Sequence, residues 1–231
     1  MIYRVIKMYT KEFWDNVYEK QNWKPPRTEA EHQKNIISVV KKFLPEDIEW
    51  KRILDYWCGE GTLGEELLKD WAKVDFAEIS SKMVEMLRKK FVYPKELSST
   101  LGDVEEWQAR VFNVNSPKDL PVSKETYDYL IVWTVLHHID PKYRKEFLDK
   151  FWELLKIDWK MIISGWDETD EILEQDWFKW HVTWKSSYTL NDLPKYLDKE
   201  KFENEETWIS SEKLSIFDKP RVVRYYVIKR R

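Results

Sequence analysis

A short apolar run that leads into an acid and then into a glycine-containing turn constrains the fold of this chain most. Ile53 and Leu54 precede Asp55, Gly59 and Gly61 follow it, and a helical pattern begins directly afterwards. This order is typical of a strand, a tight nucleotide-binding turn and a helix N-terminus. The two glycines allow positive φ and a close approach of the backbone to a ligand. The free N–H groups at the helix start can face a negatively charged or electron-rich ligand.

Strand-like and helix-like segments alternate along the rest of the chain. Apolar residues at helical spacing predict a helix between Glu29 and Phe43, for example. The predicted strands are 52–56, 72–79, 110–115, 127–133, 159–164, 206–209 and 221–228, and a short late helix is predicted over 189–197. This alternation predicts an α/β fold, a doubly wound, mostly parallel seven-stranded sheet with helices on both faces and an antiparallel C-terminal strand.

Size and charge narrow the class of protein. For 231 residues we expect a single domain over 1–231, with an N-terminal cap segment at 1–28 and an aromatic lid insertion at 166–188. The net charge is −3, so no overall field attracts nucleic acid. The single cysteine, Cys58, excludes an intrachain disulfide framework, and no apolar run is long enough to cross a membrane. We therefore expect a cytoplasmic protein with no membrane partner.

A second acid, Glu78, ends the second predicted strand. A carboxylate about 20 residues beyond a glycine turn typically accepts hydrogen bonds from ribose hydroxyls. Two oxygens with several lone pairs match two neighbouring hydroxyl groups, which explains why an acid suits this place. The alternative is a surface or helix-capping glutamate. The spacing between the turn and Glu78 favours the binding role.

Five motifs follow one another along the chain: Asp55-x-x-Cys58-Gly59-x-Gly61, Val74-x-x-x-Glu78-Ile79-Ser80-x-x-Met83, Asp119-Leu120-Pro121, Tyr127-Asp128-Tyr129-Leu130-Ile131 and Val135-Leu136-His137-His138-Ile139. In this order they resemble the motifs of class I, Rossmann-like S-adenosylmethionine-dependent methyltransferases. The resemblance extends from about Asn35 to Ile228. It implies a transferase that uses S-adenosyl-L-methionine as its cofactor.

The resemblance also implies a role for each matching position. Asp55, Gly59 and Gly61 would hold the methionine moiety, and Glu78 would bind the ribose with Ile79 beside the adenine. Asn115 and Ser116 fall at the adenine edge, with Asp103 as a rival, and Trp133 would lie near the departing methyl group. The expected cofactor-binding residues are thus Asp55, Trp57, Gly59, Gly61, Glu78, Ile79, Asn115, Ser116 and Trp133.

Trp57 departs from the family pattern, which usually has glycine at this place in the turn. DNA amino-methyltransferases resemble the pattern with a phenylalanine there, so a bulky aromatic residue need not abolish the turn. The departure leaves open a relative that keeps the architecture without turnover, as a binding or partner subunit. A dinucleotide-binding oxidoreductase uses a similar first turn, but Asp55 at the strand end argues against that class.

Methyl transfer needs a general base only when the acceptor is protonated at the working pH. The candidates are His138, His181 and Tyr188, with Asp167 as a further one. The four histidines show no metal-binding spacing, so no metal site is expected.

The acceptor class stays open between a small molecule, RNA and protein. Aromatic residues gather in the predicted lid, where they would cover a planar or apolar acceptor. Basic residues near the C-terminus would suit a phosphate backbone. These are Arg221, Arg224, Lys229, Arg230 and Arg231. Because the whole chain is slightly acidic, we favour a small-molecule acceptor over RNA or protein.

Overall fold

The computed structural model describes residues 11–20, 27–92, 108–133, 135–136, 139, 141–166, 190, 192–212 and 221–231. The first half contains α1 (Lys11–Lys20), α2 (Arg27–Phe43), β1 (Arg52–Tyr56), α3 (Thr62–Lys69), β2 (Lys73–Glu78), α4 (Ser81–Phe91) and β3 (Ala109–Asn113). The second half contains η2 (Pro117–Asp119), β4 (Tyr127–Trp133), α5 (Pro141–Leu154), β5 (Leu155–Trp166), η5 (Leu193–Lys195), β6 (Phe202–Glu212) and β7 (Arg221–Arg230).

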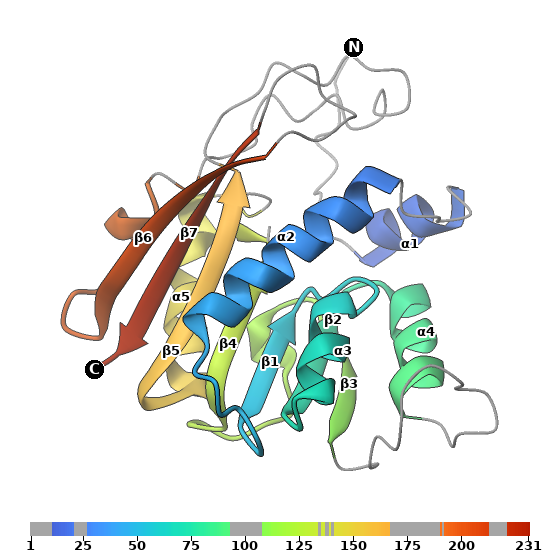
Figure 1. Ribbon diagram of the computed structural model, residues 1–231, viewed down its shortest axis with the longest axis horizontal. Helices are drawn as coiled ribbons and strands as arrows, with labels where there is room; N and C mark the ends of the chain where they lie inside the picture. Colours follow the sequence, from blue (N-terminus) through green and yellow to red (C-terminus); the bar gives the residue numbers. More distant parts are fainter. Residues whose placement is uncertain are drawn as a thin grey trace.

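The strands form a seven-stranded sheet in the order β3-β2-β1-β4-β5-β7-β6 (Figure 1). The pairs from β3 to β5 are parallel, whereas β7 runs antiparallel to both β5 and β6. This arrangement confirms the predicted doubly wound sheet with its antiparallel C-terminal strand. The order reverses between β1 and β4, and such a switch point at the carboxyl ends of parallel strands is where ligands bind in these folds.

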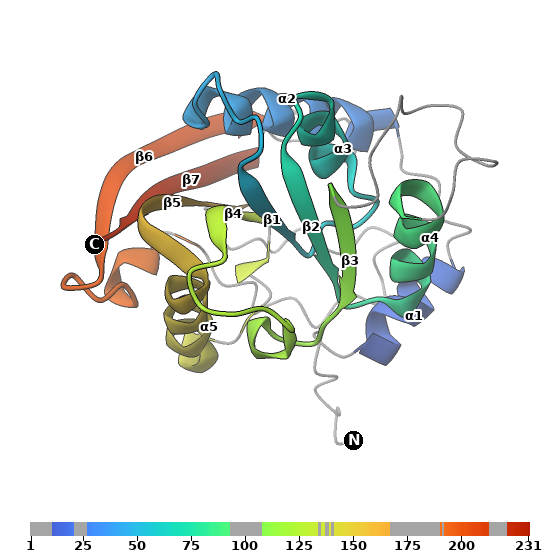
Figure 2. The same ribbon diagram turned by 90° about the horizontal axis from the view of Figure 1, so that it is seen from below.

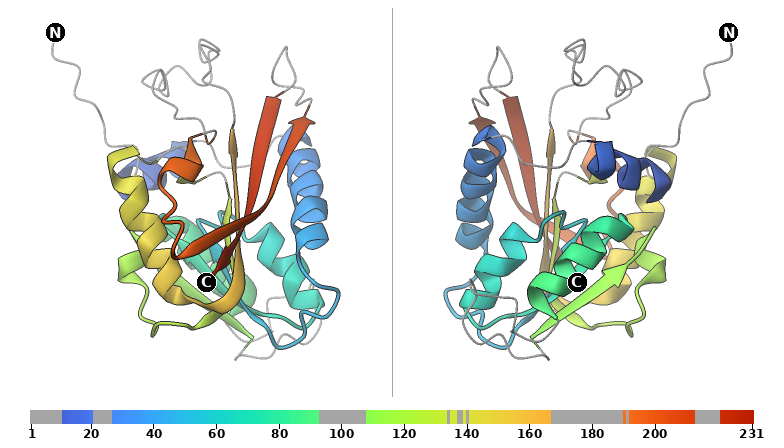
Figure 3. Two further views of the ribbon diagram at one scale, coloured as in Figure 1. Left: turned by 90° about the vertical axis from the view of Figure 1, so that its left-hand side faces the viewer. Right: turned by 90° about the vertical axis from the view of Figure 1, so that its right-hand side faces the viewer.

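Helices cover both faces of the sheet (Figure 2), and the buried side chains form a separate core on each face. One core joins the sheet to α2, α3 and α4, and the other joins it to α5. The view along the sheet in Figure 3 shows α2 and α5 on opposite sides. Strands β1, β2 and β4 are buried along nearly their whole length, because helices shield both of their faces.

Several predicted boundaries are confirmed and one element is wrong. Strands β1 and β4 have the predicted bounds, and Ser80 caps α4 by accepting the N–H of Met83. The helix predicted over 189–197 is wrong, because the described part of that segment contains only the single 3-10 turn Leu193–Lys195. Pro194 lies within this turn, and Asp192 pairs with Arg144 of α5. Pro194 has no N–H for a helical hydrogen bond, which interrupts a helix at this point, and the ion pair ties the segment to α5.

Helix α3 packs unusually closely on β2 because residue 64 has no side chain. A β-carbon added at Gly64 would lie 2.2 Å from Cε1 of Phe76 and 3.0 Å from Cγ1 of Val74. Both partners belong to the buried interior of β2, so neither can move away freely. The glycine thus sets the distance between the glycine-turn helix and the sheet.

We expect Gly64→Ala to lower the free energy of unfolding by about 1–3 kcal/mol, because the methyl group overpacks this contact. Urea denaturation followed by far-ultraviolet circular dichroism measures the effect. Glu66→Ala on the more exposed side of the same helix is the control, and it should change stability by less than about 0.5 kcal/mol. Equal stabilities of the two variants would contradict the close-packing explanation.

Candidate functional site

The turn after β1 adopts left-handed backbone conformations at three places. The φ angle is 55° at Trp57, 53° at Gly59 and 71° at Gly61. The N–H groups of Trp57 and Cys58 both donate to the carbonyl oxygen of Ala77, at 2.7 and 3.3 Å. These bonds fix the turn to the carboxyl end of β2, next to Glu78.

The two glycines of the turn have different surroundings. A β-carbon at Gly61 would lie 2.7 Å from Leu87, 2.9 Å from Phe91 and 3.0 Å from Phe76, so this glycine permits packing between helices and sheet. A β-carbon at Gly59 would meet no atom within 4 Å among the described residues. Among the described residues, Gly59 is therefore the less crowded of the two glycines, and the approach of a ligand there stays a prediction.

Glu78 points toward this turn. Its Oε2 accepts the N–H of Gly59 at 3.0 Å, while Oε1 accepts the N–H groups of Ile79 at 2.8 Å and Ser80 at 2.9 Å. Burial raises the pKa of the Glu78 carboxyl, the three N–H donors oppose that rise, and the nearby charge of Asp15 adds to it. Oε1 already accepts two N–H groups and Oε2 accepts one, so Oε2 keeps acceptor capacity for a ligand hydroxyl.

Asp55 lies beneath the turn and is 2% exposed. One of its oxygens accepts the N–H of Gly64 at 3.2 Å, which ties the end of β1 to the first turn of α3. Burial raises the pKa of Asp55 to about 7, the Gly64 hydrogen bond lowers it, and the neighbouring Glu78 charge raises it. The observed bond is to the protein, and a contact of Asp55 with the methionine moiety stays a prediction.

The indole of Trp57 stacks on the ring of Tyr56, with the centroids 6.0 Å apart and the planes inclined by 13°. Its other neighbour is Trp14 of α1, whose ring meets it edge-on at 6.4 Å. The Trp57 indole nitrogen is buried and makes no hydrogen bond to a described residue. The indole does not come within 4 Å of a β-carbon built at Gly59, and a ligand over that glycine stays a prediction.

The loop after β3 adjoins the same end of the sheet, because the N–H of Val114 donates to the carbonyl oxygen of Glu78 at 3.0 Å. The N–H groups of Asn115 and Ser116 both donate to Asp119, at 2.9 and 2.8 Å. The Asn115 side chain is exposed and Ser116 is half-buried. Their position beside the end of β2 is compatible with the adenine edge, and contact with the cofactor stays a prediction.

The remaining expected cofactor residues lie at the ends of their strands. Ile79 is buried directly after β2, and half-buried Trp133 ends β4, paired with Ser164 of β5. The expected bases His138, His181 and Tyr188 lie outside the described residues, as do Asp103, Asp167 and the lid segment from 167 to 188. Their roles stay predictions.

Two residues that the sequence interpretation missed hold the site together. Asn113, at the end of β3, donates from its side-chain amide to the carbonyl oxygens of Glu78 and Ile79, at 3.0 and 2.9 Å. Asp15 of α1 accepts the Ser80 hydroxyl at 2.7 Å. The position of Asn113 at a strand end could have marked it, whereas no local pattern marks Asp15.

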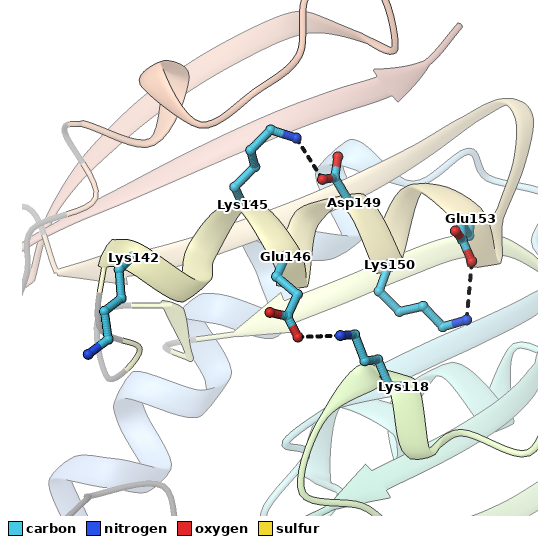
Figure 4. Close-up of a pocket in the computed structure, with 7 residues that line it drawn as sticks. All are labelled: Lys118, Lys142, Lys145, Glu146, Asp149, Lys150 and Glu153. Atoms are coloured by element: carbon cyan, nitrogen blue, oxygen red, sulfur yellow. Dashed lines mark hydrogen bonds and ion pairs between the residues drawn. The ribbon is translucent and has the colours of Figure 1, made fainter.

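A charged hollow of about 570 Å³ lies elsewhere, on the outer face of α5 (Figure 4). It is lined by Lys118, Lys142, Lys145, Glu146, Asp149, Lys150 and Glu153. Ion pairs join Lys118 to Glu146, Lys145 to Asp149 and Lys150 to Glu153 (Figure 4). Because six of its seven charged side chains pair with one another and none of its residues belongs to the glycine turn, the hollow is not the cofactor site.

No group of three or more metal-binding side chains occurs among the described residues. Nor does any helix in this part of the structure have the length and apolar character required to cross a membrane.

The sheet order, the glycine turn and the acid at the end of β2 define a Rossmann-like nucleotide-binding transferase architecture. The model of the methyltransferase domain family matches residues 29–207, which is most of the chain, and the chain therefore belongs to this family. Family and fold together assign S-adenosyl-L-methionine-dependent methyl transfer to the chain, with no acceptor specified. No curated protein matches the chain at a significant level.

Solved structures show the same fold at low sequence identity. A S-adenosylmethionine-dependent methyltransferase from Methanosarcina mazei is 17% identical, with a TM-score of 0.57 over 84% of this chain and 96% of that one. One from Archaeoglobus fulgidus is 13% identical, with a TM-score of 0.60 over 95% and 100%. The Haemonchus contortus phosphoethanolamine N-methyltransferase 2, in complex with phosphomonomethylethanolamine and S-adenosylhomocysteine, is 13% identical, with a TM-score of 0.59 over 85% and 52%.

The raised pKa of Asp55 predicts a specific pH dependence of stability. Its ordinary value is 3.8 and its folded value about 7, so the folded state binds the proton more tightly. The stabilisation that comes from binding this proton is complete below the ordinary pKa of 3.8. It is lost as the pH rises from there through the folded pKa of about 7, and the free energy of unfolding falls by at most about 1.4 kcal/mol per pH unit. Asn at position 55 cannot titrate but keeps an oxygen for the Gly64 N–H.

The stability of Asp55→Asn relative to the wild type should therefore rise between pH 4 and 7, as measured by urea denaturation at several pH values. Glu85→Gln is the control, because Glu85 is exposed and pairs only with Lys89 among the interactions described for it. Curves for Asp55→Asn and the wild type that stay parallel over this range would show that Asp55 keeps an ordinary pKa.

Proposed function

We propose that this methyltransferase binds S-adenosyl-L-methionine over Gly59, with the ribose at Glu78, and methylates a small-molecule acceptor. The hydrogen bond from Gly59 to Glu78 carries the proposal. It joins Gly59, where an added β-carbon would meet no described atom within 4 Å, to a carboxylate whose Oε2 can accept a sugar hydroxyl. A surface glutamate would not be buried with its carboxylate held by three main-chain donors.

The bound cofactor supplies an activated methyl group on a positive sulfur, and the acceptor atom displaces that sulfur in line. The chain's own contribution is alignment and exclusion of water. The left-handed turn presents its main chain at Gly59, and Glu78 fixes the sugar end. The half-buried indoles of Trp57 and Trp133 provide apolar surface at the carboxyl ends of β1 and β4, where a methyl group passes most easily without competing water.

Pairing of the C-terminal basic residues supports a small molecule over RNA. Lys229 pairs with Asp158 at 3.0 Å, Arg230 with Glu125 at 2.9 Å, and Arg231 with Glu203 at 3.6 Å. Arg230 also donates to the carbonyl oxygen of Leu155 and lies over the ring of Trp152. These three positive charges therefore already have acidic partners and are not gathered as a surface for phosphates.

Two segments of the chain would enclose the bound cofactor and acceptor. We infer one domain over 1–231, in which the segment 1–28 caps the site and the aromatic insertion 166–188 covers the acceptor. The order of the strands supports this, because the insertion follows β5 and the glycine turn follows β1, and both lie at the carboxyl ends of these parallel strands. The base for a protonated acceptor would come from His138, His181 or Tyr188.

Calorimetry with S-adenosylhomocysteine tests the cofactor assignment. We expect the wild type to bind it and Glu78→Gln to bind at least about tenfold more weakly, because charged hydrogen bonds to the sugar are replaced by weaker ones. Glu85→Gln on the exposed face of α4 is the matched control and should bind as the wild type does. Absence of binding heat in the folded wild type would favour a non-catalytic binding or partner subunit.

A labelled single-stranded RNA tests the acceptor class. We expect no binding at 0.15 M salt, since Lys229, Arg230 and Arg231 already pair with acids. Fluorescence anisotropy measures the affinity. Binding that weakens steeply with added salt, and that Arg231→Gln further weakens, would contradict the small-molecule assignment and favour RNA.

A further inference from the structure

Helix α1 contacts both loops that form the cofactor site. Trp14 meets the Trp57 indole of the glycine turn edge-on, and Asp15 binds the loop between β2 and α4. Glu19 adds an ion pair to Lys82 of α4 at 2.9 Å. Figure 1 shows α1 above α4, at the end of the sheet toward which the arrowhead of β1 points. The helix therefore spans the two loops from outside.

Ser80 links α1 to the proposed ribose-binding acid. Its main-chain N–H donates to Oε1 of Glu78 at 2.9 Å, and its hydroxyl donates to Oδ1 of Asp15 at 2.7 Å. The same hydroxyl oxygen accepts the N–H of Met83 at 3.4 Å, which caps α4. The N–H of Lys82 also donates to Asp15, at 3.4 Å. One serine thus connects a carboxylate of α1, the start of α4 and the acid at the end of β2.

We propose that Asp15 is a positioning residue of the cofactor site, and that the Asp15–Ser80 hydrogen bond fastens α1 as the cover of the bound cofactor. The inference rests on the proposed position of the cofactor between the glycine turn and Glu78. Asp15 acts through Ser80 in two ways. It orients the loop that presents Glu78, and it keeps α1 in place over the two loops.

The interactions that hold α1 are of unequal strength. The pair Glu19–Lys82 is solvent-exposed on both sides and contributes little. The bond from the Ser80 hydroxyl to a carboxylate is partly buried and charge-assisted, so it is the stronger tie. The contacts of α1 described here are made by side chains, whereas main-chain hydrogen bonds join the strands, so α1 should open more readily than the sheet does. Loosening of this one bond is therefore the step that we expect to release the cofactor.

Surface plasmon resonance with S-adenosylhomocysteine, on the full chain, measures this step. Asp15→Ala should raise the dissociation rate about tenfold, the loss expected for one charged hydrogen bond. Asp15→Asn keeps an acceptor oxygen for Ser80 but loses the charge, so its dissociation rate should lie between those of Asp15→Ala and the wild type. Glu19→Gln, the matched control on the same helix, should change the rate by less than about threefold.

A double variant with both Asp15→Ala and Ser80→Ala shows whether the two residues act through one shared hydrogen bond or independently. Ser80→Ala should also speed dissociation, and Asp15→Ala in that background should add little, because the bond is already absent. Hydrogen exchange provides a structural readout: S-adenosylhomocysteine should protect the amides of 11–20 in the wild type and not in Asp15→Ala. Exchange in β1 and β4 should be equal in the two proteins, which shows that both are folded.

A wild-type dissociation rate in Asp15→Ala, or equal protection of α1 in both proteins, would overturn the inference and leave the proposed function intact. A wild type that binds no S-adenosylhomocysteine would overturn both. Additive effects of Asp15→Ala and Ser80→Ala would also overturn it, because they would mean that the two residues act separately.

Discussion

The rest of the site depends on the way in which the Glu78 carboxylate is bound. Three main-chain N–H groups, from the glycine turn and from the two residues after β2, converge on its oxygens. A buried carboxylate is costly unless donors surround it, and here the donors come from the loops that must be aligned for a ligand. The same interactions that make burial tolerable therefore set the spacing of the two loops.

The second buried acid, Asp55, fixes the other side of the turn by a hydrogen bond from the main chain. It ties the end of β1 to Gly64, and Gly64 in turn lets α3 approach Phe76 of β2. The glycine turn is thus held between two carboxylates, one beneath it and one beside it. Its main chain can keep left-handed angles at Trp57, where a residue other than glycine carries a conformational cost of about 1–2 kcal/mol, because these surrounding bonds over-determine it.

The parts of the fold that the sequence predicts are those with strong local patterns. The bounds of β1 and β4 are confirmed because short, mainly apolar runs, each with a single internal acid, indicate strands with both faces covered. The segment 189–197 is wrong as a helix, since its conformation depends on Asp192 meeting Arg144 of α5. The Gly59–Glu78 pair follows from spacing, but Asp15 does not, because 65 residues separate it from Ser80. Contacts between distant segments leave no local pattern.

The contact between Trp14 and Trp57 has an optical consequence. Two indoles whose centres lie 6.4 Å apart at an interplanar angle of 62° couple their electronic transitions. One belongs to the helix over the site and the other to the turn beneath it. Separation of the two rings would alter the near-ultraviolet circular dichroism of the protein. The molecule thus carries an intrinsic chromophore pair that reports, without any added label, whether the helix and the turn are together.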